Sequence, residues 1–265
     1  LESYGTDLLP NQSMGLRKQI DQFIGNNDGI INSSEINNFS DLIISSRDWN
    51  NSFLAGCCSF DYSSLTAIEN EVIIYSMSTI DFRSVVQVFL EIKPDEIYNL
   101  SGQSSVGLSF EMPFDTHESI SIGTLNILEV IRLFKPDLKF YNASSSECFG
   151  DTGGTRANEK TPFRPKSPYG VAKSSAFWQV SNYREAYDLH VSSGILFNHE
   201  SFLRPKRFVT QKIVLSAIDI YEKKQKFLKV GNVDISRDWG WAPDYVKAMH
   251  LILQQNKPDD YIIAT

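Results

Sequence analysis

Residues 140–150 read FYNASSSECFG, an apolar run followed by small hydroxyl residues, an acid and a glycine. This order predicts a strand whose carboxyl end opens into a polar loop. In open α/β sheets, ligands bind at the carboxyl ends of the strands. The segment therefore predicts a strand that ends in a ligand-binding loop, with Ser145 and Glu147 as candidate site residues. A serine-rich turn that caps the next element is the alternative interpretation of the same residues.

A helix with a tyrosine and a lysine on one face is predicted downstream, in residues 167–173, SPYGVAK. Ser167 suits a helix cap, and Pro168 suits a first turn. Tyr169 and Lys173 are spaced to lie on the same helix face, about one turn apart. A tyrosine phenol titrates at about 10, so it needs a nearby cation to act as a base at neutral pH. The pair predicts such a base, although an ordinary helix pair has the same spacing.

Strands and helices alternate along most of the chain. Strands are expected at 72–75, 96–100, 139–142, 190–196 and 227–230, and helices at 82–92, 120–133, 167–187 and 209–221. Pro94 supports one of these boundaries, because a proline there ends the preceding helix. The alternation predicts an α/β fold with a parallel sheet, right-handed crossovers and helices on both faces.

Composition bounds the class of protein. The chain has 265 residues, 42% hydrophobic content and a formal charge of −7, which indicates one large or two small globular domains. Apolar runs are short and broken by charges, and no secretory leader is recognisable, so we expect cytoplasmic residence and no membrane partner. The acidic balance argues against a nucleic-acid partner. Three cysteines are too few for a disulfide framework or a zinc site, and no metal is expected at the candidate site.

Several motifs together resemble the GDP-mannose 4,6-dehydratases, extended short-chain dehydrogenase/reductases that make nucleotide-linked 6-deoxy sugars. Besides the serine–glutamate loop and the Tyr–Lys helix, the motifs are PDEIYNL at 94–100, QSSVGLSFE at 103–111, GILFNHES at 194–201 and RDWGWA at 237–242. The resemblance implies a Rossmann-like doubly wound parallel sheet at 41–201, which carries the cofactor and the catalytic residues. It also implies that 202–265 form part of a smaller substrate-binding lobe. In the family a further segment completes that lobe, so both domains are expected to be incomplete here.

The resemblance implies a role for each catalytic residue. Tyr169 would take the proton of the sugar 4-hydroxyl while hydride leaves C4 for NADP, and Lys173 would support the phenolate and contact the cofactor ribose. Ser145 would hydrogen-bond the C4 oxygen, in place of the threonine common in the family. Glu147 would take the C5 proton and then protonate the departing C6 hydroxyl, after which hydride returns to C6. Epimerases and reductases of the superfamily do not need this glutamate, because they eliminate no water.

The resemblance also implies the partners. The cofactor would be NADP, the substrate GDP-mannose and the product GDP-4-keto-6-deoxymannose. The implied cofactor-binding residues are Arg47, Leu100, Ser101, Gln103, Ser104, Tyr169, Lys173, His199 and Arg204. The implied substrate-binding residues are Asn198, Lys212 and Arg237. Relatives assemble as dimers or tetramers, so a homo-oligomer is expected.

Residues 1–40 depart from the family pattern. The family opens with a strand and a glycine-rich turn that seats the cofactor pyrophosphate, whereas the glycines at 5, 15, 25 and 29 are too widely spaced to form that turn. Two hypotheses therefore stay open. One is an active dehydratase, and the other is a catalytically impaired relative that acts as a binding or assembly module. A 4-epimerase or reductase on another nucleotide sugar is a third.

Residues 24–35, IGNNDGIINSSE, are spaced like a degenerate EF-hand calcium loop. Gly29 falls at the sharp turn, and Glu35 falls at the last ligand position. Ile24, however, occupies the position of the first carboxylate. A loop rich in Asn, Asp and Gly that binds no calcium is the alternative interpretation.

Overall fold

The computed structural model describes residues 42–46, 52–55, 72–201, 203–204, 206, 208–231 and 234–265. For residues 42–46, 52–55 and 72–74 it describes the backbone alone. The atypical segment 1–40, the calcium hypothesis at 24–35 and Arg47 all lie outside the described residues.

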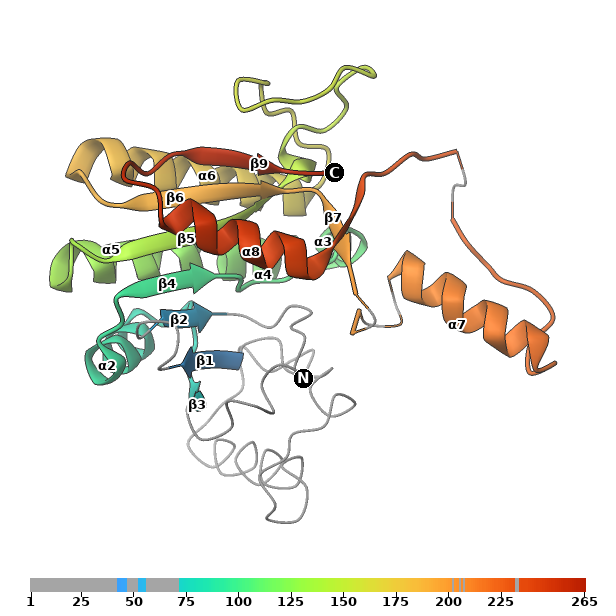
Figure 1. The fold of residues 1–265 in the computed structure, drawn as a ribbon, viewed down its shortest axis with the longest axis horizontal. Coiled ribbons are helices and arrows are strands. Elements are labelled where there is room, and N and C mark those ends of the chain that lie inside the picture. Colours follow the sequence, from blue (N-terminus) through green and yellow to red (C-terminus); the bar gives the residue numbers. More distant parts are fainter. Residues whose placement is uncertain are drawn as a thin grey trace, which may run out of the picture.

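A seven-stranded sheet forms the centre of the described fold, with strand order β3-β1-β2-β4-β5-β6-β9 (Figure 1). The strands are β1 (Leu42–Ser46), β2 (Ser52–Ala55), β3 (Val72–Ser76), β4 (Glu96–Asn99), β5 (Lys139–Ser145), β6 (Val191–Leu196) and β9 (Asp260–Ile263). From β2 to β9 all neighbours run parallel, which confirms the expected parallel sheet for its larger part. The expectation is wrong for β1, which pairs antiparallel with both β2 and β3. Large parallel sheets commonly carry such an antiparallel margin.

Helices cover both faces of the sheet (Figure 1). They are α2 (Phe82–Ile92), α3 (Val106–Glu111), α4 (Pro113–His117), the π-helical turn η5 (Glu118–Ile122), α5 (Gly123–Phe134), the 3-10 turn η6 (Ser146–Cys148), α6 (Pro168–Tyr187), α7 (Val209–Tyr221) and α8 (Ala242–Leu253). Successive residues of β5 show the two layers, because strand side chains alternate between faces. Phe140 joins the core with Val180 of α6, whereas Tyr141 joins the core with Leu253 of α8. The sheet is therefore doubly wound, as predicted.

Local sequence signals set the limits of the helices. The Asp81 side chain accepts a hydrogen bond from Arg83 N (3.0 Å) and starts α2. The same helix ends at Lys93, whose φ of 50° is left-handed, and Pro94 follows. Ser167 Oγ accepts from Gly170 N (3.0 Å), so the predicted cap of α6 is confirmed.

The segment after β6 contains a second, smaller sheet. In it β7 (Asn198–Glu200) pairs in parallel with β8 (Trp239–Trp241). Helix α7 extends away from the large sheet and buries none of its side chains (Figure 1). The strand expected at 227–230 is wrong, since this segment is irregular and exposes Phe227 by 62% and Val230 by 42%. An isolated strand leaves its backbone groups unpaired, so an apolar pattern alone does not make one.

The boundary predicted at residue 202 stays a prediction, but part of the segment after it belongs with the large sheet. β9 pairs with β6, and α8 packs against β5 and β6. The Arg184 guanidinium of α6 fixes β9 further by donating to both carboxylate oxygens of Asp260. Among the described helices, none is both long enough and apolar enough to cross a membrane.

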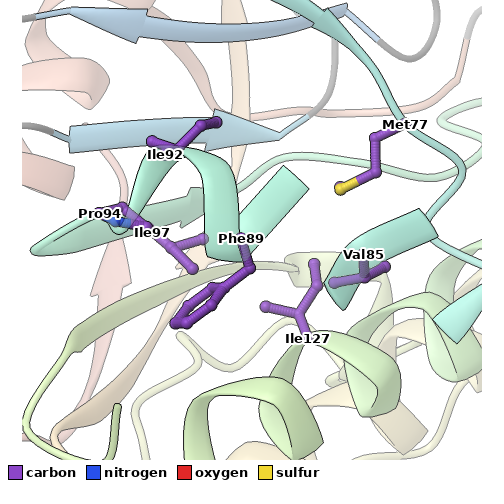
Figure 2. Close-up of a pocket in the computed structure, with 7 residues that line it drawn as sticks. All are labelled: Met77, Val85, Phe89, Ile92, Pro94, Ile97 and Ile127. Atoms are coloured by element: carbon purple, nitrogen blue, oxygen red, sulfur yellow. The ribbon is translucent and has the colours of Figure 1, made fainter. Parts of the chain in front are cut away.

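An apolar cavity lies between α2, β4 and α5 (Figure 2). Its lining residues are Met77, Val85, Phe89, Ile92, Pro94, Ile97 and Ile127. All of these side chains are apolar, and the cavity measures about 10 Å³. That is barely room for one water, and no polar group is there to hold it. The cavity is therefore a packing gap and not a ligand site.

Candidate active site

The serine–glutamate loop and the Tyr–Lys helix meet at the carboxyl end of β5. Ser145 is the last residue of that strand and is buried, and Glu147 lies in the following turn η6. Glu147 N donates to Ser145 Oγ (3.3 Å), which fixes the loop on the strand. A Cβ at Gly170 would lie 2.8 Å from Glu147 O, so only glycine lets the first turn of α6 approach this loop so closely.

Lys173 is held between α6 and the end of β5. It is 8% exposed, and its Nζ donates to Ala143 O (2.8 Å). Nζ lies 5.9 Å from the centroid of the Tyr169 ring, so the pair predicted from its spacing does form. Tyr169 packs against Ile120 of η5.

A buried amide network fixes the carboxyl end of β4, where Leu100 and Ser101 lie. Ser101 donates to Asn99 Oδ1 from both N (3.2 Å) and Oγ (2.6 Å). Asn99 Nδ2 in turn donates to Asn142 Oδ1 (3.2 Å) and to Thr124 Oγ1 (3.1 Å). The network joins β4, β5 and α5. Sequence reasoning missed it, although two asparagines inside apolar strands were a usable signal, because buried amides need partners.

Gln103 and Ser104 follow this network toward η5. Gln103 N donates to Ser119 Oγ (3.3 Å), and Gln103 Nε2 donates to Ser105 O (2.8 Å) and Thr116 Oγ1 (3.1 Å). Ser104 is exposed. The loop is therefore anchored to the π-helical turn, a kind of turn found frequently at functional sites.

Asn198, His199 and Arg204 lie in and just after β7. His199 Nδ1 is 2.9 Å from Phe197 O, and burial lowers the pKa of this histidine below its ordinary value. The Arg204 guanidinium pairs with Glu200 (3.4 Å) and stacks on the Phe208 ring, 3.7 Å from its centroid. Tyr245 of α8 stacks on His199, a contact that the sequence did not predict.

The remaining predicted residues lie at the surface. Lys212 is exposed on α7, which stands away from the large sheet (Figure 1). Arg237 is exposed before β8, and its Nη1 donates to Ser236 O (3.2 Å). In the part of the chain that the structure describes, no group of three or more His, Cys, Asp and Glu side chains is placed to hold a metal ion.

The family model for GDP-mannose 4,6 dehydratase matches residues 50–265. The chain belongs to the GDP-mannose 4,6-dehydratase family. It is 49% identical over 187 residues to the GDP-mannose 4,6 dehydratase of Drosophila melanogaster, which covers 70% of this chain and 47% of the relative. It is 51% identical over 178 residues to GDP-mannose 4,6 dehydratase 1 of Arabidopsis thaliana, which covers 66% of this chain and 49% of the relative. The chain thus spans about half the length of these curated family members.

Solved structures share the fold. RMD from Pseudomonas aeruginosa, complexed with NADPH, matches with a TM-score of 0.67 and 23% identity, covering 72% of this chain and 66% of the other. The likeness supports the doubly wound architecture of this family member. Four of the implied residues, Ser145, Glu147, Tyr169 and Lys173, come from the end of β5, the turn η6 and the first two turns of α6, and we name them the β5–α6 group.

Proposed function

We propose that this chain is a nucleotide-sugar 4,6-dehydratase that uses NADP and converts GDP-mannose to GDP-4-keto-6-deoxymannose. The observation that carries the proposal is the β5–α6 group itself. It brings together, at the carboxyl end of β5, the segments that carry a hydroxyl, a carboxyl, a phenol and a buried ammonium. Ligands of parallel sheets bind at that end of the strands. Membership of the family supports the substrate.

The nicotinamide half of an NADP site fits the residues present. Lys173 is buried at the end of β5, where its Nζ donates to Ala143 O. His199, half-buried in β7, would lie beside the nicotinamide. Leu100, Ser101, Gln103 and Ser104 would line the cofactor from the end of β4, and Arg204 would face its phosphates. Arg47 would face the 2′-phosphate, because a guanidinium binds phosphate through paired hydrogen bonds. The NADPH in the Pseudomonas aeruginosa structure supports this choice of cofactor.

The bound cofactor would accept hydride from C4 of the sugar and return it at C6. Tyr169 would take the proton of the 4-hydroxyl, with the cation of Lys173 stabilising the phenolate, while Ser145 donates to the C4 oxygen. The C4 ketone acidifies the C5 proton, which Glu147 removes. Glu147 then delivers this proton to the departing C6 hydroxyl, which leaves as water. When hydride returns to C6, C5 needs a proton, and Tyr169 would supply the one that it took from the 4-hydroxyl. The hydrogen bond from Glu147 N to Ser145 Oγ ties the backbone of the glutamate to the serine, so the two residues belong to one loop.

Residues beyond the β5–α6 group would hold the nucleotide sugar. Asn198 would face the substrate from β7, and Lys212 and Arg237 would bind its diphosphate side. Lys212 and Arg237 are both exposed, so their cations are accessible to a charged ligand from solvent. Homo-oligomer formation and cytoplasmic residence stay predictions.

The decisive experiment is incubation of the purified chain with NADP and GDP-mannose, followed by mass spectrometry of the sugar nucleotide. We expect a product that has lost one water. Glu147→Gln should retain cofactor but lower dehydration by about 100-fold or more, the contribution of a positioned acid–base group. Glu185→Gln, an exposed carboxyl on α6, is the matched control and should leave the rate unchanged.

Other outcomes point to the alternative functions. Neither retained cofactor nor product would favour an impaired relative that serves as a binding or assembly module. A product that keeps its C6 hydroxyl would favour a 4-epimerase or a reductase. Loss of cofactor and product together in Glu147→Gln would mark Glu147 as a structural acid.

A further inference from the structure

His199 lies opposite a glycine in the small sheet. In the parallel pairing of β7 with β8, the partner of His199 is Gly240. Directly after β8 the chain turns into α8, whose first turn carries Tyr245, and this tyrosine is 2% exposed. His199 is therefore brought next to Gly240 and Tyr245, which follow it much later in the chain, where the small sheet joins α8.

The Tyr245 ring covers one face of the imidazole. The two ring centroids are 4.6 Å apart, with an interplanar angle of 28°, so the rings are stacked. A Cβ at position 240 would overlap the Tyr245 ring. Glycine at this position therefore provides the space that the tyrosine occupies. The Tyr245 hydroxyl lies 3.5 Å from Asp238 Oδ1, at the limit of a hydrogen bond, so the packing of the ring contributes more to its position than this contact does.

One tautomer of His199 is selected by the backbone. Its Nδ1 is 2.9 Å from Phe197 O. A carbonyl oxygen only accepts, so Nδ1 carries the hydrogen and donates it, which leaves Nε2 of the neutral ring as an acceptor. The hydrogen bond restrains Nδ1, and the stack restrains the plane of the ring. Together they leave the imidazole little freedom to rotate.

The same contacts connect the small sheet to the large one. Tyr245 belongs to the core cluster that also contains Leu196 of β6 and Met249 of α8. That cluster includes Ala143, whose carbonyl holds Lys173. The position of His199 is thereby set against the strand that carries the β5–α6 group, although His199 itself lies in the small sheet.

We propose that Tyr245 is a positioning residue, which, in the space left by Gly240, fixes the plane of His199 and presents its Nε2 acceptor to the nicotinamide end of the cofactor. The inference rests on the proposed function for the identity of the ligand, because His199 is placed beside the nicotinamide there. The fixed imidazole itself is a property of the protein without cofactor and is measurable without it.

The test compares three variants of the full chain. Tyr245→Leu removes the stacked ring, Tyr245→Phe keeps the ring and removes only the hydroxyl, and Met249→Ala removes a buried side chain one turn further along α8. The imidazole nitrogens of His199 are followed by ¹⁵N–¹H NMR, with His199→Asn assigning the signals. NADPH affinity is followed by its fluorescence.

We expect Tyr245→Leu to convert the single Nδ1–H tautomer into a mixture and to raise the pKa of His199 toward its ordinary value, because burial is the main cause of its depression. NADPH affinity should fall by about three- to tenfold, the scale of one aromatic stack. Tyr245→Phe should retain both properties. Met249→Ala should lower the melting temperature but leave the imidazole signals and NADPH affinity as in the wild type.

Two results would overturn the inference: an unchanged His199 spectrum in Tyr245→Leu, or equal changes in Met249→Ala. If Tyr245→Leu does not fold, Gly240→Ala displaces the ring without deleting it and should produce the same spectral change. A wild-type chain that does not bind NADPH refutes the proposed function and the role in presenting Nε2. The NMR comparison then still decides whether Tyr245 fixes His199.

Discussion

At the scale of the single residue, the burial of the Lys173 ammonium has to be explained. Removing an ammonium from water is costly unless hydrogen bonds replace its hydration. Lys173 is 8% exposed, and its bond to Ala143 O supplies part of that replacement. A methionine at this position would fill similar space without the cost. The retention of a charge beside Tyr169 is therefore better explained by chemistry than by stability.

His199 makes stability depend on pH. Burial lowers its pKa below the ordinary value, so the unfolded chain binds protons more readily than the folded chain. A histidine shifted in this direction contributes stability above its ordinary pKa of about 6.5 that is lost as the pH falls below it. We expect the free energy of unfolding, measured in urea, to decline between about pH 7 and pH 5. His199→Asn should make that decline shallower.

The control for this prediction is His117, which is exposed on α4. His117→Asn removes an imidazole that lies at the surface and leaves His199 and its surroundings unchanged, so it shows whether the loss of any histidine alters the decline. His190, whose pKa burial also lowers, accounts for the slope that remains in His199→Asn. Parallel pH profiles of wild type and His199→Asn would contradict the prediction.

At the scale of elements, two neighbouring tyrosines differ in how their hydroxyls are paired. Tyr98 of β4 and Tyr141 of β5 are register partners, with ring centroids 6.1 Å apart. Tyr98 OH donates to Glu96 Oε2 (2.8 Å). Tyr141 OH is buried and has no hydrogen-bond partner among the described residues. We expect Tyr141→Phe to leave stability unchanged or raise it by up to about 1 kcal/mol, and Tyr98→Phe to cost about 1.5–3 kcal/mol.

Chemical denaturation of both variants gives the comparison. The substitutions are identical in volume, so the difference between them isolates hydrogen bonding from packing. Glu96 also accepts from Gln254 Nε2 (2.9 Å) of the segment after α8, so Tyr98→Phe weakens a link between β4 and that segment. Equal losses in the two variants would show that Tyr141 OH has a partner, such as a buried water.

The cavity between α2, β4 and α5 leaves room for a substitution that adds an atom instead of removing one. Val85 lines it and is itself buried (Figure 2). Val85→Ile adds one methylene directed at the gap, and we expect it to raise the free energy of unfolding by about 0.8 kcal/mol. Val180→Ile adds the same group to the core under α6, where Val180 is fully buried, and should be neutral or destabilising. A loss of stability in Val85→Ile would show that the gap cannot admit the extra carbon.

These elements also show how far the sequence could be used. The end of α2 was predictable because Pro94 follows it, and the Tyr169–Lys173 pair was predictable because both residues lie on one helix. The stack of Tyr245 on His199 was not predictable, since it depends on the pairing of two short strands far apart in the chain. The strand expected at 227–230 was wrong because strand formation also depends on a pairing partner. Its apolar residues follow the right pattern but have no neighbouring strand.

At the scale of the whole molecule, the two faces of the large sheet carry different parts of the proposed site. The face under α5 and α6 carries the amide network and the lysine that end at the β5–α6 group, and the face under α8 carries Tyr245 toward His199. The parallel strands bring both sets to one edge, because all their carboxyl ends point the same way. The contacts of β9 with β6 and α6 close the sheet beside that edge.

The cofactor should therefore stabilise the molecule as a whole, which makes thermal unfolding a test of the complete site. A ligand present at 100 times its Kd adds about 2.7 kcal/mol to the folded state, which corresponds to roughly 5–10 °C for a chain of this size. We expect NADP to raise Tm by that amount and NAD to raise it less, because only NADP carries the 2′-phosphate proposed to face Arg47. Lys173→Met should fold but show a smaller shift at every NADP concentration, since it loses the cation that is proposed to contact the cofactor. Equal shifts in wild type and Lys173→Met would place the cofactor elsewhere, and no shift at millimolar NADP would mean that a chain without the glycine-rich turn does not hold it.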